Sequence, residues 1–304
     1  MRLVEFEESY FDEVQKLLNL SLFEDVVSDR SLRRITFDDP NYNKRYALVA
    51  LENEEVVGFI LGAKREKAPE ELVETQKELA WIKVFAVREN YRRKGIATKL
   101  FEELENRFRD SGTKKVRITD FPGWTLFCGV DLKYQDALAF LLGRGFKKVG
   151  EAVDYEIDLL NFYIPRRILQ TNVSPAIIRK AEKSDKNKVL SWVKTEFSVF
   201  WEYEASVGFM YDKPKLWIAE DNDEIIGFSV YSALEPHWFG PIGVSPKTRL
   251  KGIGSLLLFN CLKSMREEGQ RIAVIPWTSH LFFYAQVPGI NKIRHYWILE
   301  KAFV

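Results

Sequence analysis

The sequence has few of the residues that build metal centres or disulfide frameworks. Its 304 residues include two cysteines, Cys128 and Cys261, and three histidines. Neither residue type occurs at the spacing of a zinc site. Because one cysteine falls in each half of the chain, a structural disulfide is not expected either. The sequence therefore predicts no bound metal and no disulfide scaffold.

An excess of charge of one sign and long apolar runs are also missing. The chain carries 45 basic and 44 acidic residues, for a net charge of +1. No global field therefore favours nucleic acid or an anionic membrane. No segment approaches about 18 uninterrupted apolar residues, and the N-terminus has no apolar signal region. We expect no nucleic-acid partner, no membrane partner and a cytoplasmic location.

What the chain does contain is a repeat. The stretch 53–59, NEEVVGF, matches 222–228, NDEIIGF, and each predicts a polar turn that enters an apolar strand. Further on, Gly95 and Gly252 lie 252 − 95 = 157 positions apart, and Gly112 and Gly269 lie 269 − 112 = 157 apart. We infer two copies of one unit, each with a helix of the same length. The extra residues of the first copy fit the charged stretch 64–78, which predicts a surface insertion.

Each copy has a short strand that runs into Arg-x-x-Gly-x-Ala/Gly and then a helix. The first strand is 84–87 and its motif is 92–97; the second strand is 242–244 and its motif is 249–254. A turn of this kind leaves backbone N–H groups free at a helix start, where the positive end of the helix dipole also lies. Glycine allows phosphates to approach closely. The motif therefore predicts a phosphorylated ligand, held twice.

In this order of elements the motif resembles the acetyl-CoA-binding motif of the GNAT (Gcn5-related) N-acetyltransferases, and the resemblance covers nearly the whole chain as a tandem pair. It implies an α/β fold of two domains, each a mostly antiparallel mixed sheet flanked by helices. The expected division is an N-terminal domain over 1–160, a linker over 161–175 and a C-terminal domain over 176–304. The implied activity is direct transfer of an acetyl group from acetyl-CoA to a primary amine of a small molecule or peptide.

The resemblance also implies which residues contact coenzyme A. In the second copy they are Ile242, Gly243, Val244, Arg249, Leu250, Lys251, Gly252, Ile253, Gly254 and Ser255. In the first copy they are Phe85, Ala86, Val87, Arg92, Arg93, Lys94, Gly95, Ile96, Ala97 and Thr98.

The expected acid and base lie in the second copy. Tyr284 stands where the family places the tyrosine that protonates the leaving thiolate, and a phenol is mostly protonated at neutral pH. In the first copy Leu141 occupies that position and cannot donate a proton, so the second domain is the expected catalyst; Tyr134 is a weaker substitute there. His237 precedes the motif strand and titrates in the useful range for a general base. Glu235 and His280 are alternatives.

Other interpretations stay open. Both domains could bind acyl-CoA without turnover, as in a regulatory protein. A dinucleotide-binding fold is not expected because neither copy has the three glycines of that motif. Aromatic residues between 192 and 211 could line an acceptor site or be core. The acceptor itself, and whether the protein is a monomer or a homodimer, do not follow from the sequence.

Overall fold

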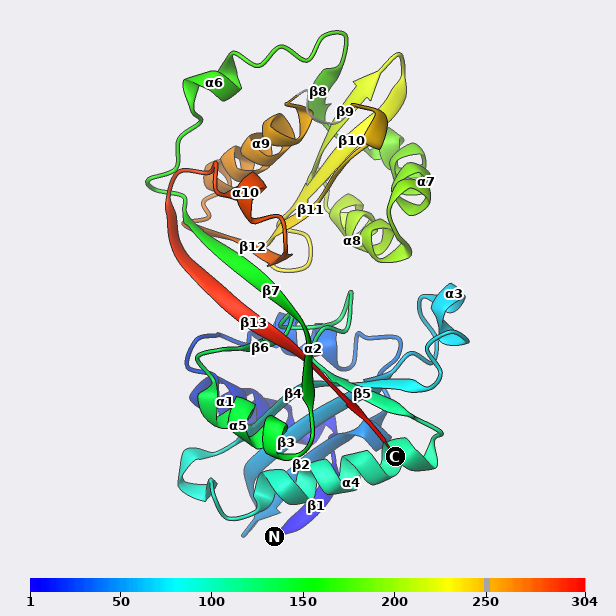
Figure 1. Ribbon diagram of the computed structural model, residues 1–304, viewed down its shortest axis with the longest axis vertical. Helices are drawn as coiled ribbons and strands as arrows, with labels where there is room; N and C mark the ends of the chain where they lie inside the picture. The colour runs from blue at the N-terminus through cyan, green and yellow to red at the C-terminus, as the bar shows by residue number, and fades with distance from the viewer. Residues whose placement is uncertain (249–251, 304) are drawn as a thin grey trace. The chain divides into compact units, whose positions relative to one another are not determined.

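The computed structural model describes residues 1–248 and 252–303 and divides into two compact units (Figure 1). Unit 1 comprises Met1–Ala152 and the C-terminal residues from Tyr296 onward; unit 2 comprises Val153–His295. Both units are mixed α/β structures built on mostly antiparallel strands with helices, as the sequence predicts.

Unit 1 is a single sheet with helices on both faces. Its elements are β1 (Arg2–Glu5), α1 (Phe11–Ser21), α2 (Asp29–Ile35), β2 (Ala47–Glu52), β3 (Glu55–Lys64), α3 (Glu70–Val73), β4 (Leu79–Val87), α4 (Ile96–Asp110), β5 (Lys115–Ile118), β6 (Val130–Asp131) and α5 (Gln135–Gly143). The strand order is β1-β2-β3-β4-β5, followed by β13 (Ile290–Ala302) and β7 (Lys147–Asp158). Only β4 and β5 are parallel among the first five. One apolar core lies under α4 and α5, and a second under α1 and α2.

Unit 2 repeats this plan. Its elements are α6 (Arg166–Leu169), β8 (Ile177–Lys180), α7 (Lys186–Glu196), α8 (Val199–Met210), β9 (Leu216–Asp221), β10 (Glu224–Tyr231), β11 (Phe239–Val244), α9 (Ile253–Glu267), β12 (Ile272–Thr278) and α10 (Leu281–Tyr284). Strands β8 to β11 form an antiparallel sheet in the order β11-β10-β9-β8, and β12 pairs with β7. Helix α9 packs on one side of the sheet and helices α7 and α8 on the other.

The two predicted hairpins have the same backbone. Asn53 and Glu54 have φ values of +49° and +64°, and Asn222 and Asp223 have +49° and +63°. Two successive residues with positive φ form the tight turn that matches the twist of a two-stranded hairpin. The repeat inferred from the sequence is therefore present in the backbone itself.

The two motif helices also match. Helices α4 and α9 each have 15 residues, and each is followed closely by a glycine with positive φ, Gly112 at +76° and Gly269 at +93°. Helix α4 lies close to β3, where a side chain on Gly58 would come within 2.9 Å of Ile96. The glycine on this strand therefore lets the helix pack directly against the sheet.

The aromatic-rich stretch after residue 199 forms helix α8, whose apolar residues pack against the sheet and α7. One local expectation needs correction. The charged stretch 64–78 is not wholly on the surface, since Lys64 and Arg65 are buried. The linker contains the short helix α6, which anchors Ile168 in the core of unit 2.

The division into units differs from the expected boundaries at 160 and 176. Strand β7 leaves unit 1 after Ala152, and β13 re-enters it at Tyr296. In unit 1 the end of β13 pairs with β5, Leu299 opposite Ile118, and with β6, Tyr296 opposite Asp131. Residues 296–302 of the last strand therefore complete the sheet of the first unit, while its residues 290–295 belong to the second.

Candidate functional site

In unit 1 the parallel pair β4 and β5 opens partway along its length. The two strands pair from Leu79 opposite Lys115 to Ile82 opposite Ile118, where β5 ends. The Thr119 N–H still donates to the Ile82 carbonyl at 2.7 Å. Beyond this point the edge of β4 that faced β5 continues to Val87 without it. That edge includes the predicted contacts Phe85, Ala86 and Val87.

A register shift in β4 marks the opening. Leu61 of β3 pairs with Val84, and the next residue, Gly62, pairs with Ile82, which leaves Lys83 as the extra residue. Such a bulge bends the strand and reverses which face the following side chains occupy. Ile82 accordingly lies in the core under α4, and Val84 in the core under α1.

In the described part of unit 2, the segment that leads into β11 shares one isolated parallel bridge with β12. Trp238 bridges Val274, whose N–H donates to the His237 carbonyl at 2.7 Å. From Phe239 onward β11 pairs with β10 and no longer with β12. The edge of β11 away from β10 includes the predicted contacts Ile242, Gly243 and Val244. Both units therefore offer an extended strand edge to a ligand, which could pair with it as an added strand does.

Each open strand leads to a helix that begins at a left-handed glycine. Gly95 caps α4 with φ +81° and Gly252 caps α9 with φ +85°. The first helical bonds run from Lys99 to Gly95 and from Leu256 to Gly252. The N–H groups of the three residues between have no acceptor within the helix. Neither helix has a side-chain cap or an acidic residue in its first turn, so these donors favour an anion.

The predicted pyrophosphate site of unit 1, residues Arg92–Thr98, is rich in exposed cations. Arg92, Arg93 and Lys94 are all exposed, and the Arg92 Nε donates to the Val87 carbonyl at 3.1 Å. Arg93 has φ +62° and Gly95 has φ +81°, so two of the three residues from 93 to 95 have a left-handed backbone. A turn of this type directs neighbouring N–H groups into one concavity. Ile96 is buried below it, with Ala97 and Thr98 half-buried.

In the predicted pyrophosphate site of unit 2, the structure describes Gly252 to Ser255. Arg249, Leu250 and Lys251 lie outside the described residues. Ile253 is buried, and Gly254 and Ser255 are half-buried. The Ser255 hydroxyl donates to Gln286 Oε1 at 2.9 Å, and Gln286 Nε2 donates to the Phe283 carbonyl at 2.6 Å. These bonds fix the end of α10 beside the first turn of α9.

Tyr284 lies close to the start of the open edge of β11 in unit 2. Its ring centroid is 6.3 Å from that of Phe239, the first residue of β11 after the bridge, and 6.3 Å from that of Tyr155. The side chain is buried, and burial raises the pKa of the phenol well above its usual value. The phenol therefore stays protonated at physiological pH and can act as a proton donor.

His237 lies next to the bridge between β11 and β12, with its side chain exposed and its ring 6.4 Å from that of Trp238. Glu235, the alternative base, is buried. His280 caps α10 and its carbonyl accepts the Phe283 N–H. The structure thus places His237 and Tyr284 on segments that flank the opening of unit 2.

In unit 1 the residue that the sequence predicts to correspond to Tyr284 is Leu141. Leu141 is fully buried in the core under α4. The hydroxyl of Tyr134 donates to Asp25 Oδ2 at 2.8 Å and accepts the Glu24 N–H at 3.1 Å. Tyr134 therefore anchors the loop between α1 and α2, which accounts for its hydroxyl without a role in proton transfer.

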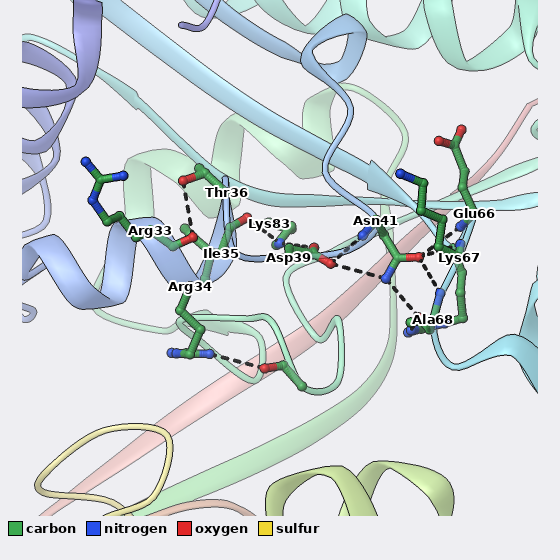
Figure 2. Close-up of polar contacts among 12 residues, drawn as sticks. Arg33, Arg34, Ile35, Thr36, Asp39, Asn41, Glu66, Lys67, Ala68 and Lys83 are labelled. Atoms are coloured by element: carbon green, nitrogen blue, oxygen red, sulfur yellow. Dashed lines mark hydrogen bonds and ion pairs between the residues drawn. The ribbon is translucent and has the colours of Figure 1, made fainter. Parts of the chain in front are cut away.

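The opening of unit 1 instead contains a buried ionic network that the sequence analysis missed (Figure 2). The Lys83 ammonium donates to Asp39 Oδ2 at 2.8 Å and to the Ile35 carbonyl at 2.5 Å. Asn41 extends the network: its Nδ2 donates to Asp39, and its Oδ1 accepts the N–H groups of Glu66, Lys67 and Ala68. Burial lowers the pKa of Lys83 to about 8. A lysine within the apolar run of β4 was the signal that could have revealed it.

Asp120 is a second buried acid at this opening. It follows β5 with φ +28°, after Thr119 at +61°, and its carboxylate lies 2.6 Å from Arg117. Burial raises the pKa of Asp120 to about 7, although Arg117 opposes the shift. Strained backbone and a perturbed carboxyl at one place are typical of a functional site.

Two kinds of feature are absent from the described residues. Over 1–248 and 252–303, no group of three or more histidine, cysteine, aspartate and glutamate side chains could hold a metal ion. In the same part of the chain, no helix combines the length and apolar character needed to cross a membrane.

Comparison with solved structures shows the same architecture. The chain superposes over 99% of its length on a GCN5-related glucosamine N-acetyltransferase region of a fungal multi-domain GH3 β-N-acetylglucosaminidase (TM-score 0.79, 16% identity), of which it spans 38%. It matches a GCN5-related N-acetyltransferase from Sphaerobacter thermophilus (TM-score 0.72, 15% identity, 99% of this chain and 95% of that one). It also matches a tandem GNAT protein from the clavulanic acid biosynthesis pathway, without AcCoA (TM-score 0.65, 12% identity, 99% and 98%).

These identities establish the fold alone, and no curated protein sequence matches the chain. The sequence itself carries the family assignment twice. Residues 11–123 and residues 181–281 each match the acetyltransferase (GNAT) family, one segment for each copy of the repeat. The chain therefore belongs to the GNAT acetyltransferase family, in a tandem two-unit form.

Proposed function

We propose that the protein transfers the acetyl group of acetyl-CoA to a primary amine by direct attack, and that unit 2 performs the transfer. The observation that supports this most is the pairing of an open strand edge with a helix that begins at a left-handed glycine. Gly252 and the three N–H groups after it suit a diphosphate, and β11 leads from them to the bridge at Trp238. Acetyl-CoA would supply the thioester carbon that the amine attacks.

Tyr284 is the proposed acid of this reaction. The departing thiolate needs a proton, and a phenol that is protonated at physiological pH has one to donate. The ring contact with Phe239 places the phenol near the first residue of β11 beyond the bridge. His237 is the proposed base, because an exposed imidazole can take the proton of the amine and pass it to water.

For unit 1 we propose coenzyme binding without turnover, and Leu141 is the observation that favours it. Its site keeps the glycine, the helix and the cations Arg92 to Lys94. The position of the acid is filled by a fully buried leucine, which has no proton to donate. The acceptor amine is proposed to be a small molecule or a peptide.

Replacing Tyr284 by phenylalanine tests the assignment. We expect kcat to fall about a hundredfold or more, since a positioned acid or base contributes at least that much. Coenzyme A affinity should stay the same, because the proposed pyrophosphate contacts are the N–H groups that follow Gly252 and not the phenol. The assay is thiol release with a panel of amines, paired with calorimetric titration of coenzyme A.

Tyr231→Phe is the matched control. Tyr231 is also a buried tyrosine of unit 2, but its hydroxyl donates at 3.1 Å to Glu268, at the opposite end of α9 from Gly252. This variant should keep kcat. If Tyr284→Phe keeps kcat as well, the acid is elsewhere. If no amine supports thiol release by the unaltered protein while coenzyme A binds, the non-catalytic interpretation applies to both units.

A further inference from the structure

The two pyrophosphate sites differ in one respect that their sequences do not show. A Cβ atom built on Gly95 would meet nothing within 4 Å. A Cβ atom built on Gly252 would lie 2.5 Å from the Cγ2 methyl of Thr171. The two glycines have nearly the same φ and cap helices of equal length. The face of the glycine is therefore open in unit 1 and covered in unit 2.

The residue that covers Gly252 belongs to the linker before β8. Thr171 follows helix α6; its N–H donates to the Ile168 carbonyl at 3.1 Å and its Oγ1 to the Arg167 carbonyl at 3.0 Å. On one side of Thr171, Ile168 is buried in the core under α9. On the other side, Val173 packs against the cluster that contains Ile253. The linker is thus anchored on both sides of its contact with the glycine.

We propose that residues 166–173 of the linker form a strap that covers the pyrophosphate site of unit 2, so that coenzyme A binds unit 1 first and enters unit 2 only when Thr171 leaves Gly252. The proposal rests on the proposed function, since it concerns access to the same site. The glycine serves the site because its missing side chain leaves room for phosphate oxygens. In this structure the Thr171 methyl occupies part of that room.

The strap lowers the apparent affinity of unit 2 without changing its contacts. When only a fraction of molecules has the site uncovered, the apparent dissociation constant rises by the inverse of that fraction. The contact over Gly252 is a single methyl group, so its removal should shift affinity by about fivefold rather than by orders of magnitude. Ile168 and Val173 keep the rest of the linker in place while Thr171 moves.

The experiment is calorimetric titration of coenzyme A into the full chain. Gly95→Asp silences unit 1: the position has open space, aspartate tolerates a left-handed backbone, and its charge repels phosphate. The test variant, made in this background, is Thr171→Gly. Two matched controls accompany it. Thr171→Val keeps the methyl bulk, and Gln170→Gly adds the same backbone freedom one residue earlier, at an exposed position.

We expect the unaltered protein to show one tight and one weaker equivalent of coenzyme A, and Gly95→Asp to lose the tight one. In that background Thr171→Gly should bind about fivefold more tightly, whereas Thr171→Val and Gln170→Gly should not. Two equal sites in the unaltered protein, or the same gain from Gln170→Gly, would overturn the strap and leave the proposed function intact. Absence of binding in every variant would overturn the proposed function, and the strap with it.

Discussion

Replacing Lys83 by methionine removes one partner of a buried ion pair and leaves the other in place. The side chain of Lys83 is 1% exposed and that of Asp39 is fully buried, with 2.8 Å between Nζ and Oδ2. Methionine fills a similar volume without charge. Asp39 would then keep two hydrogen bonds from Asn41, one from its N–H at 2.8 Å and one from its Nδ2 at 3.2 Å, and its electrostatic interaction with Arg65.

The magnitude follows from the burial of both groups. Loss of one member of a buried pair costs about 3–5 kcal/mol, because the remaining charge is left in a medium that solvates it poorly. The Ile35 carbonyl also loses its bond from Lys83. Since whole domains are stable by about 5–15 kcal/mol, Lys83→Met should bring unit 1 close to unfolding at 37 °C.

The stability of the unaltered protein should also depend on pH through Lys83, and the sign is defined. Because burial lowers the pKa of Lys83 to about 8, from an unfolded value of 10.5, stability should rise as the pH rises between these two values. Lys83→Met should lack this rise.

The assay is hydrogen exchange of peptides from β4, because the two units can unfold separately and a single global transition would mix them. The double variant Lys83→Met with Asp39→Asn removes both charges and keeps an acceptor for Asn41. It should recover at least about 2 kcal/mol of the loss, which a double-mutant cycle reports as coupling. A loss below about 1 kcal/mol, or additive single effects, would refute the reasoning.

Two further predictions concern single sites. Asp120→Asn should remove a pH dependence of stability, because burial raises the folded pKa of Asp120 from 3.8 to about 7. As the pH rises from 4 to 7, the free energy of unfolding of the unaltered protein should fall relative to that of the variant by up to about 1.4 kcal/mol per pH unit. Urea unfolding measures this, and the same pH dependence in both proteins would contradict the prediction. Gly243→Ala should destabilise unit 2 by about 1–3 kcal/mol, because the new Cβ would lie 2.4 Å from the Phe197 ring; Gly143→Ala, with nothing within 4 Å, is the control, and equal melting temperatures for the two variants would contradict the prediction.

The sequence predicted what depends on local pattern. Both hairpins, both motif helices and both helix-capping glycines follow from turn residues and from apolar spacing that a short window contains. The offset of 157 positions is the same for Gly95 and Gly252 as for Gly112 and Gly269, and the two helices between these glycines have equal length. Local signals of this kind do not need knowledge of the partner strand.

What could not be predicted depends on contacts between distant residues. A lysine in β4 is visible in the sequence, but its partner Asp39 lies 44 positions away in a loop without periodicity. The contact of Thr171 with Gly252 joins residues 81 positions apart, and the linker composition suggested only an irregular segment. The destination of the last strand is a third case, because strand pattern shows that β13 exists but not which sheet it joins.

That last strand has a consequence for how the protein must be made. Until residues 296–302 have been synthesised, the sheet of unit 1 ends at β5, and β6 lacks the strand with which it pairs; all of unit 2 is translated in between. A nascent chain carrying only the first 160 residues would present an unfilled sheet edge, which is a site for aggregation. Cutting the gene at the linker therefore does not yield two autonomous halves, and a fragment meant to isolate unit 1 would need its final strand supplied in trans.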